Sequence, residues 1–222
     1  SIDLKAFRKI ARRAPAGRAE LAPLAPIGQR IAVARDEAFA FCYASVLEGW
    51  RAAGAELSFF SPLADEAPVD GADAIYLPGG YPELQAGRLA GNGQFMGGLR
   101  EAAARGAAVY GECGGYMVLG QGLIDANGTR HTMAGLLPLE TSFADRKRHL
   151  GYRLVTAASD SPVGNNGQRY TGHEFHYATI LTEGPADPLF TATDALDVDL
   201  GLAGLVAGRV AGSFIHLIDR AP

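Results

Sequence analysis

The stretch Gly111-Glu112-Cys113-Gly114-Gly115 decides which fold this chain can adopt. It follows the apolar run 107–110 and precedes a second apolar run, 116–119. That order predicts a buried strand, a tight turn that carries the cysteine, and then a helix. The glycines at 111, 114 and 115 suit such a turn, because a Cβ at these positions would clash where strand and helix are pinched together.

The chemistry expected of this turn is that of a cysteine nucleophile for acyl transfer. A thiol at a helix N-terminus meets unpaired N–H groups and the positive end of the helix dipole, and both favour the thiolate. The pentapeptide by itself is equally compatible with a buried structural cysteine in a glycine-rich turn.

Length and composition narrow the class of protein. The 222 residues are 48% hydrophobic and 20% charged, with a formal net charge of -4, which fits one large domain or one domain with an appendage. A mildly acidic chain has no general attraction for nucleic acid or anionic membranes. Cys42 and Cys113 are the two cysteines, and their spacing predicts neither a disulfide framework nor a zinc site. With no long apolar run and no signal peptide at its start, the chain is expected to be cytoplasmic.

The first 26 residues differ from the rest. Leu4, Phe7 and Ile10 recur at helical spacing between basic residues, and a proline-dotted stretch follows as far as Pro26. We expect a short basic helix within residues 1–13 and then an irregular linker. This segment would either connect to a partner domain or be a solvated helix at a chain end.

From residue 27 onward, short apolar runs alternate with amphipathic segments. Strands are predicted at 30–34, 56–60, 73–77 and 107–110, and helices at 39–53 and 94–105. This alternation predicts an α/β fold with a mostly parallel sheet flanked by helices on both faces. The second half is less regular, with strands expected at 133–139, 151–155 and 170–177 and a hairpin over 205–216.

In parallel sheets, sites form at the carboxyl ends of the strands. Cys113 falls at such an end, and His216 follows an apolar run, so His216 is the candidate base. An oxyanion hole is expected from the amide of Gly114 and from the turn at Gly80, where glycine allows close approach of the backbone.

The segment His173-Glu174-Phe175-His176 contains two metal-binding residue types. In a strand, His173 and His176 would point to opposite faces, so no metal site is predicted there. Glu174 and His176 would share a face and could contact a polar ligand. The chain has no P-loop sequence, so any ATP must bind outside it.

Taken together, these motifs resemble the class I glutamine amidotransferases, and among them the glutaminase domains of the cobyrinic and hydrogenobyrinic acid a,c-diamide synthase family. The resemblance rests on residues 32–41, 59–63, 76–84, 111–119, 135–138, 172–177 and 212–217. The segments Ala34-Arg35-Asp36 and His173–Tyr177 favour this family over the cobyric acid synthases.

The resemblance implies a flavodoxin-like fold and ATP- and glutamine-dependent amidation of the a and c carboxylates of a corrin ring. Residues 27–222 would be the glutaminase domain and 1–26 the tail of an interdomain connection. An N-terminal synthetase domain, absent here, would bind ATP and magnesium, while this domain would bind no cofactor or metal. L-glutamine, the corrin substrate and the synthetase domain are the expected partners, with a homodimer as a further option.

Residue by residue, the resemblance implies that Cys113 is the nucleophile, that His216 raises its nucleophilicity, and that the amides near Gly80 and Gly114 hold the oxyanion. Typical members carry a glutamate two residues after the histidine, but this chain has Ile218 there. The group that orients His216 is therefore open between Asp219, Glu174 and a backbone carbonyl. Further candidates for contacting or orienting substrate are Tyr81, His176 and Arg35.

Three alternatives stay open. One is the glutaminase domain of a cobyric acid synthase. Another is a different cysteine hydrolase on the same scaffold, and the last is a non-catalytic module that binds the corrin.

Overall fold

The computed structural model describes residues 3–10 and 22–222. Part of the linker expected within residues 14–26 lies outside these ranges. The helices are α1 (Leu4–Ile10), α2 (Ala44–Ala52), α3 (Ala86–Gly91), α4 (Gly93–Ala104) and α5 (Gly114–Leu119), and the 3-10 turns are η1 (Glu37–Phe39), η2 (Pro62–Ala64) and η3 (Pro82–Leu84). None of the helices in the described part of the chain has the length and hydropathy needed to span a bilayer.

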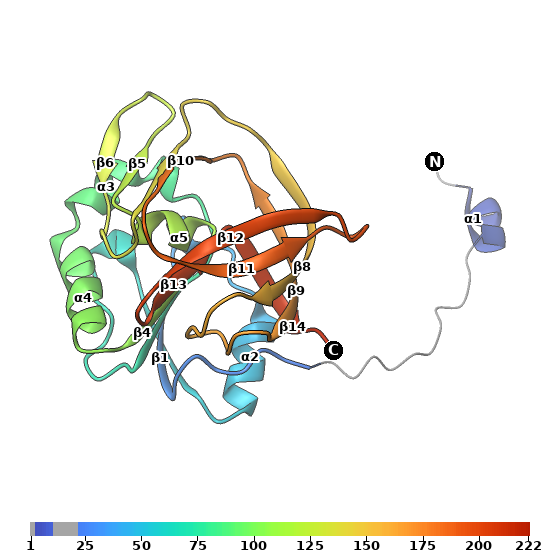
Figure 1. The fold of residues 1–222 in the computed structure, drawn as a ribbon, viewed down its shortest axis with the longest axis horizontal. Coiled ribbons are helices and arrows are strands. Elements are labelled where there is room, and N and C mark those ends of the chain that lie inside the picture. Colours follow the sequence, from blue (N-terminus) through green and yellow to red (C-terminus); the bar gives the residue numbers. More distant parts are fainter. Residues whose placement is uncertain (1–2, 11–21) are drawn as a thin grey trace.

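Strands form a ten-stranded sheet and a smaller four-stranded sheet (Figure 1). The large sheet has the order β14-β9-β8-β11-β12-β13-β4-β3-β1-β2, and the small one β10-β7-β5-β6. In chain order the strands are β1 (Arg30–Ala34), β2 (Glu56–Phe60), β3 (Ala74–Leu77), β4 (Ala108–Glu112), β5 (Gly122–Ile124), β6 (Arg130–Thr132), β7 (Leu139–Ser142), β8 (His149–Ala157), β9 (Arg169–His176), β10 (Thr179–Glu183), β11 (Asp187–Thr193), β12 (Asp199–Ala207), β13 (Val210–Ser213) and β14 (Ile215–Arg220).

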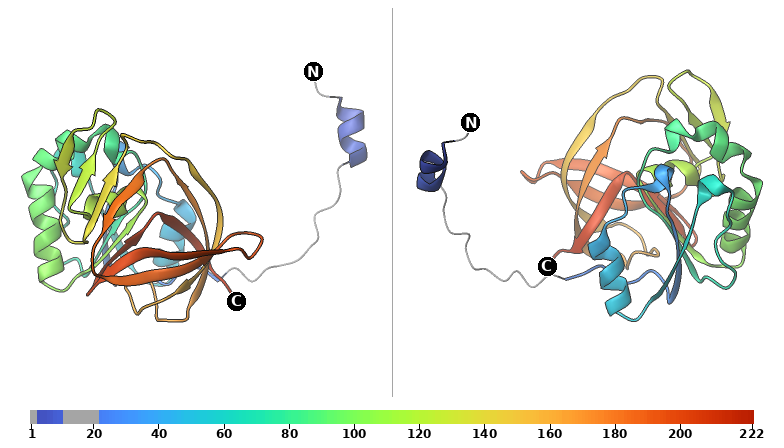
Figure 2. Two further views of the ribbon diagram at one scale, coloured as in Figure 1. Left: turned by 45° about the horizontal axis from the view of Figure 1, so that its top comes forward. Right: turned by 180° about the vertical axis from the view of Figure 1, so that it is seen from behind.

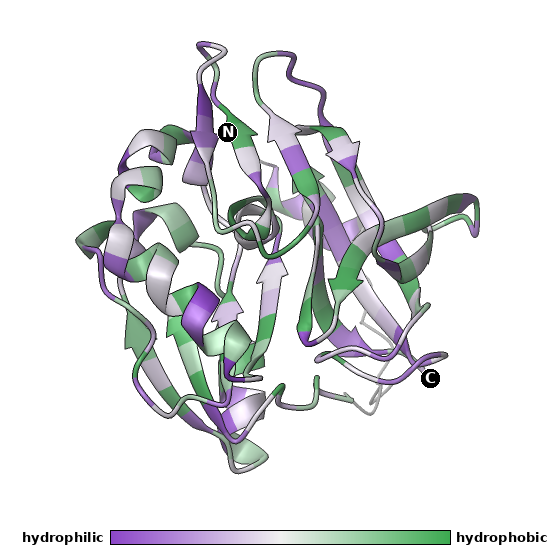
Figure 3. Ribbon diagram, turned by 60° about the vertical axis from the view of Figure 1, so that its left-hand side comes forward, coloured by the Kyte–Doolittle hydropathy of each residue, from purple (hydrophilic) through white to green (hydrophobic). Residues whose placement is uncertain are grey.

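The predicted α/β class is confirmed, and the large sheet is mixed. Strands β2, β1, β3, β4 and β13 pair in parallel, and the remaining pairs of the large sheet are antiparallel. Among them β1, β3 and β4 are short, buried and rich in hydrophobic residues, coloured green in Figure 3, whereas the edge strand β2 is half-exposed. Such runs are typical of strands that are covered on both faces.

Successive side chains along each strand point to opposite faces of the sheet, and each face has its own hydrophobic core. Ala32 and Ile75 face a core that includes α4 and α5, whereas Ile31 and Tyr76 face a core that includes α2. Helices therefore cover both faces of the parallel half, as Figure 1 shows for α4 and α2.

The antiparallel half curls back on itself. Strand β13 ends at Ser213 and β14 begins at Ile215, yet these strands lie five places apart in the strand order. One residue cannot cross a flat sheet of that width, so the strands from β13 to β14 must bend round until the outer strand meets the end of β4 (Figure 2). One hydrogen bond fixes this closure, from the Leu217 N–H of β14 to Glu112 Oε1 at the end of β4 (3.1 Å).

Three predicted elements differ in the structure. The helix expected over 39–53 begins only at Ala44, because the Phe41 N–H donates to the Gly79 carbonyl (2.9 Å) and holds the chain out of the helix there. The hairpin expected over 205–216 consists of β12 and β13, so His216 lies in a separate strand, β14.

The strand expected over 133–139 is irregular up to Pro138. Its backbone N–H groups turn toward the end of α5: Ala134 donates to the Val118 carbonyl and Leu136 to the Leu119 carbonyl. This segment therefore satisfies the last carbonyls of a helix, which the apolar pattern alone does not reveal.

The packing of α4 gives a stability prediction. The Phe95 ring is fully buried between the rings of Phe39 and Phe60, with centroid distances of 6.3 and 6.2 Å. We expect Phe95→Ala to lower the free energy of unfolding by about 3–5 kcal/mol, because it removes buried surface and leaves a cavity. Urea titration measures this loss. Leu196→Ala, at a side chain that is 83% exposed, is the control and should change stability by less than about 0.5 kcal/mol.

Candidate active site

Cys113 occupies the single residue between β4 and α5, as the sequence predicted. Its backbone has φ 48° and ψ -101°, a conformation that few residues other than glycine adopt. A Cβ on Gly115 would collide with the Leu77 carbonyl, so the helix can start this close to the sheet only with glycine there. The cysteine is thus held in a strained strand-to-helix turn, the geometry of a nucleophile elbow.

His216 lies beside this turn. Its side chain is 2% exposed and stacks on the His173 ring, with centroids 4.8 Å apart. A Cβ built on Gly79 would lie 3.2 Å from His216 Nε2 and 3.3 Å from Cys113 Cβ. Because both side chains flank that one point, Gly79 must be glycine, and the structure brings together the cysteine and the histidine that the sequence singled out.

Two backbone N–H groups lie beside the Cys113 turn. The Gly80 nitrogen lies 3.0 Å from where a Cβ on Gly114 would be. Within the described residues, the N–H groups of Gly80 and Gly114 have no hydrogen-bond acceptor apart from the Cys113 sulfur, toward which the Gly114 amide points. Free donors beside a nucleophile are what an oxyanion hole requires.

The resting protonation states differ from the sequence-based expectation. Burial raises the pKa of the Cys113 thiol to about 12, although the Gly114 amide lowers it. Burial, together with the neighbouring His173 and His176, lowers the pKa of His216 to about 4. The expected thiolate is therefore not the resting form: near neutral pH a neutral thiol faces a neutral imidazole, and the thiol donates to the Phe175 carbonyl (3.8 Å).

Sequence reasoning missed Glu112, which precedes the cysteine. Its carboxylate is buried and accepts hydrogen bonds from the hydroxyls of Tyr76 (2.8 Å) and Tyr110 (3.1 Å). Its Oε2 also lies 3.7 Å from Nδ1 of His216. The available signal was an acidic residue that ends an otherwise apolar strand, two residues after a tyrosine on the same face.

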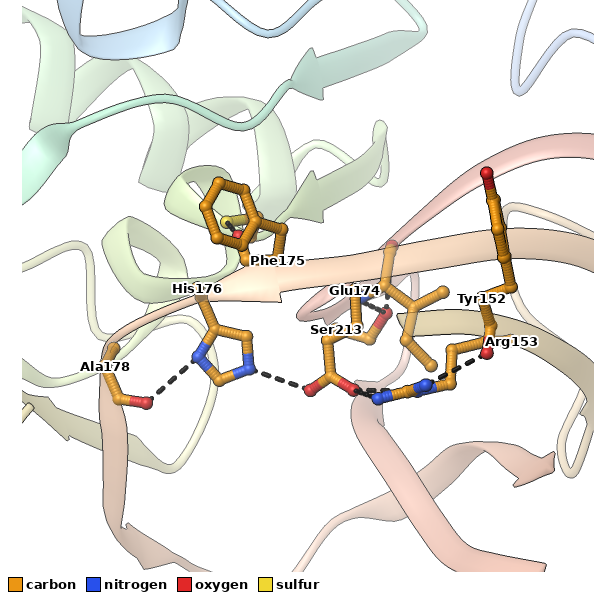
Figure 4. Close-up of polar contacts among 9 residues, drawn as sticks. Tyr152, Arg153, Glu174, Phe175, His176, Ala178 and Ser213 are labelled. Atoms are coloured by element: carbon orange, nitrogen blue, oxygen red, sulfur yellow. Dashed lines mark hydrogen bonds and ion pairs between the residues drawn. The ribbon is translucent and has the colours of Figure 1, made fainter. Parts of the chain in front are cut away.

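Glu174 and His176 share one face of β9, as predicted, and they bind each other rather than His216. Figure 4 shows Arg153, Glu174, His176 and Ala178 in a continuous chain of polar contacts. Arg153 Nη2 lies 2.7 Å from Glu174 Oε2, and His176 Nε2 lies 2.8 Å from Glu174 Oε1. Burial opposes ionisation of Glu174, but its hydrogen bonds with His176 and Arg153 lower its pKa to about 2.

His149 joins Glu174 and His176 in a group whose ligand atoms all lie within 4.8 Å of one another. The His149 and His176 rings stack in parallel at 4.6 Å, so their in-plane lone pairs do not converge on one point. Arg153 already neutralises the carboxylate. This cluster does not have the geometry of a metal site, and the prediction that the domain binds no metal stays a prediction.

The other predicted residues lie near the site's rim or away from it. Tyr81 is 46% exposed and packs edge-on against Phe41, with centroids 4.9 Å apart. Arg35 lies over the Phe59 ring and lines an open cavity of 710 Å³. Asp219 pairs through its backbone with Thr171 and Pro23, and the structure shows no contact between its carboxylate and His216.

Comparison with solved structures supports this class of fold. PurLQS from Thermotoga maritima superposes with a TM-score of 0.61 at 20% identity, covering 85% of this chain and 87% of that one. A glutamine amidotransferase from the same organism gives 0.56 at 17% identity, covering 84% and 75%. At these identities the likeness establishes the fold, that of the class I glutamine amidotransferases.

The sequence identifies the family. Residues 30–221 match the model of the CobB/CobQ-like glutamine amidotransferase domain, and the chain belongs to that family. A hydrogenobyrinate a,c-diamide synthase from a Sinorhizobium species is 60% identical over 99% of this chain and 50% of its own length. The enzyme of that name from Rhodobacter capsulatus is 51% identical over 98% of this chain and 49% of its own. The chain thus spans about half the length of these relatives.

The resting thiol gives a prediction for chemical modification. Because burial keeps Cys113 protonated, we expect native Cys113 at pH 7 to react with iodoacetamide on the order of 10³-fold more slowly than in the unfolded chain. Timed alkylation followed by peptide mass mapping measures both rates. Fast alkylation of native Cys113 below pH 7 would show that the thiolate is already formed at rest.

Proposed function

We propose that this chain is the glutaminase half of an ATP- and glutamine-dependent amidoligase that amidates the a and c carboxylates of hydrogenobyrinate or cobyrinate in cobalamin biosynthesis. The observation that carries the proposal is that Cys113 and His216 both flank Gly79, while the Gly80 and Gly114 amides lie beside the same turn. The names of the relatives favour hydrogenobyrinate as the acceptor and an a,c-diamide synthase over a cobyric acid synthase.

The geometry supports a thioester mechanism. As Cys113 Sγ attacks the side-chain amide carbon of glutamine, His216 Nε2 takes the thiol proton. The N–H groups of Gly80 and Gly114 stabilise the oxyanion. His216 then returns the proton to the leaving nitrogen, which departs as ammonia. Water, deprotonated by His216, cleaves the thioester to release glutamate and regenerate the thiol.

The neutral resting pair has a mechanistic consequence. A thiol with a pKa near 12 and an imidazole with a pKa near 4 do not exchange a proton spontaneously. Proton transfer must therefore accompany attack on a bound glutamine, whose developing oxyanion makes the transfer favourable. An empty site would hold Cys113 unreactive.

Ammonia would serve a synthetase half outside this chain. That half would bind ATP, magnesium and the corrin; this sequence contains no P-loop, so we derive no step that involves ATP here. We also propose a cytoplasmic location, which the two free cysteines support.

Glu83 is the candidate for binding the ammonium group of glutamine. It lies in η3, whose Pro82 would contact a side chain on Gly114, and its Oε2 is buried without a partner in the described residues. Burial raises the pKa of Glu83 to about 7. A bound ammonium group would satisfy this carboxylate and favour its ionised form.

The central prediction concerns the nucleophile. A glutamine analogue with an electrophilic diazoketone, 6-diazo-5-oxo-norleucine, should add one covalent label per chain, mapped to Cys113 by mass spectrometry. Cys113→Ser should lose this label and all glutamine hydrolysis, because its hydroxyl is a poorer nucleophile in a site built for sulfur. Cys42→Ser is the matched control and should be labelled normally. A label that persists in Cys113→Ser would refute the proposal, as would its absence from the unmodified chain.

The ammonium site makes a kinetic prediction. Glu83→Gln should raise the KM for glutamine on the order of 10-fold and change kcat less, because a charged hydrogen bond to the substrate is lost. In the unmodified protein, KM should fall as pH rises through about 7, where Glu83 ionises. Steady-state glutaminase assays, with and without a synthetase half, test both. An unchanged KM would remove Glu83 from the substrate site.

A further inference from the structure

His216 has one ring nitrogen without a partner. Nδ1 is buried and forms no hydrogen bond within the described residues. A neutral imidazole carries its single hydrogen on either Nδ1 or Nε2. For Nε2 to take the thiol proton, that hydrogen must lie on Nδ1, so the proposed mechanism needs an acceptor facing Nδ1.

Glu112 faces that nitrogen and has one acceptor position left. Its Oε1 accepts from Tyr110 and from the Leu217 N–H, and its Oε2 accepts from Tyr76. The remaining position on Oε2 is directed to His216 Nδ1, 3.7 Å away. Catalytic hydrogen bonds are often long in a free enzyme and shorten when substrate binds.

We propose that Glu112 is the positioning residue for His216, a role that the sequence left open between Asp219, Glu174 and a backbone carbonyl. Its carboxylate holds the hydrogen on Nδ1, fixes the ring toward Cys113 and stabilises the imidazolium that forms when Nε2 takes the thiol proton. This inference rests on the proposed glutaminase function and adds a named group to it. The position two residues after His216 holds Ile218, which is 37% exposed and whose side chain cannot accept a hydrogen bond.

The other two side chains considered as acceptors for Nδ1 do not reach the His216 ring. Glu174 is bound by Arg153 and His176, and Asp219 shows no contact with the His216 ring. Glu112, by contrast, is the residue directly before Cys113. The same turn therefore sets the position of both the sulfur and the group that orients its base.

The surroundings of Glu112 set the pH at which it can act. Facing it are Tyr76 from β3, Tyr110 from β4, His216 from β14, and Cys42 and Tyr43 from the segment that leads into α2. Burial raises its pKa to about 7, while the hydrogen bonds from Tyr76, Leu217 and Tyr110 lower it. Since only the ionised carboxylate accepts from Nδ1–H in this way, activation of Cys113 should increase as pH rises through about 7.

The test measures the rate at which saturating 6-diazo-5-oxo-norleucine labels Cys113 between pH 5.5 and 9, on this chain and on the chain combined with a synthetase half. Saturation removes the pH dependence of binding through Glu83 from the measured rate. The unmodified protein should show a rise with a midpoint near 7. Glu112→Gln should lower the plateau on the order of 10²-fold and remove that midpoint. Glu112→Asp should recover part of the rate and restore a midpoint, because a carboxylate returns. Glu183→Gln, which alters another carboxylate bound by a tyrosine, should leave rate and midpoint unchanged.

Tyr110→Phe is the second variant and does not depend on how well Glu112→Gln folds. It removes one donor that favours the ionised carboxylate, so the midpoint of labelling should move to higher pH. An unchanged midpoint in Tyr110→Phe, or a normal rate and profile in folded Glu112→Gln, would overturn the role of Glu112. If the unmodified protein is not labelled at all, the glutaminase function itself fails, which is a separate result.

Discussion

Helix α5 lies so close to strands β3, β4 and β13 that several residues where they touch are glycines, which have no side chain. A Cβ on Gly115 would meet the Leu77 carbonyl, and one on Gly111 would lie 2.8 Å from the Gly115 oxygen. From the other side, a Cβ on Gly212 would lie 2.7 Å from the Tyr116 ring. The chain must therefore turn from strand to helix within one residue, and the backbone of Cys113 takes the strain. The positions of the Gly114 amide and of Glu112 follow from the same turn.

The second constraint is the curl of the antiparallel strands. A flat sheet would leave β14 at the edge farthest from β2, well away from β4. Curling brings β14 against the end of β4, where the Leu217 amide meets Glu112 and the His216 ring comes beside Cys113. The parallel half of the sheet thus supplies Cys113, the proposed nucleophile, while the antiparallel half supplies His216, the proposed base.

The sequence pattern predicts those structural features that are determined by residues close together in the chain. The elbow at Cys113 and the strand geometry of His173 and His176 follow from glycine placement and from alternation. Residues 40–43 and 133–138 were mispredicted because their backbone groups bind distant partners, the Gly79 carbonyl and the end of α5. Glu112 escaped notice for the same reason: Tyr76 reaches it from the neighbouring strand β3, and only the curl of the sheet brings His216 to it.

Burial of Cys113 has an effect beyond acyl transfer. Peroxide oxidises thiolates far faster than thiols, and it must reach the sulfur to do so. Cys113 is 3% exposed, and at rest its sulfur is protonated and donates to a carbonyl. The packing that, in the proposed mechanism, delays attack until an amide is bound therefore also protects this sulfur from conversion to sulfenic acid.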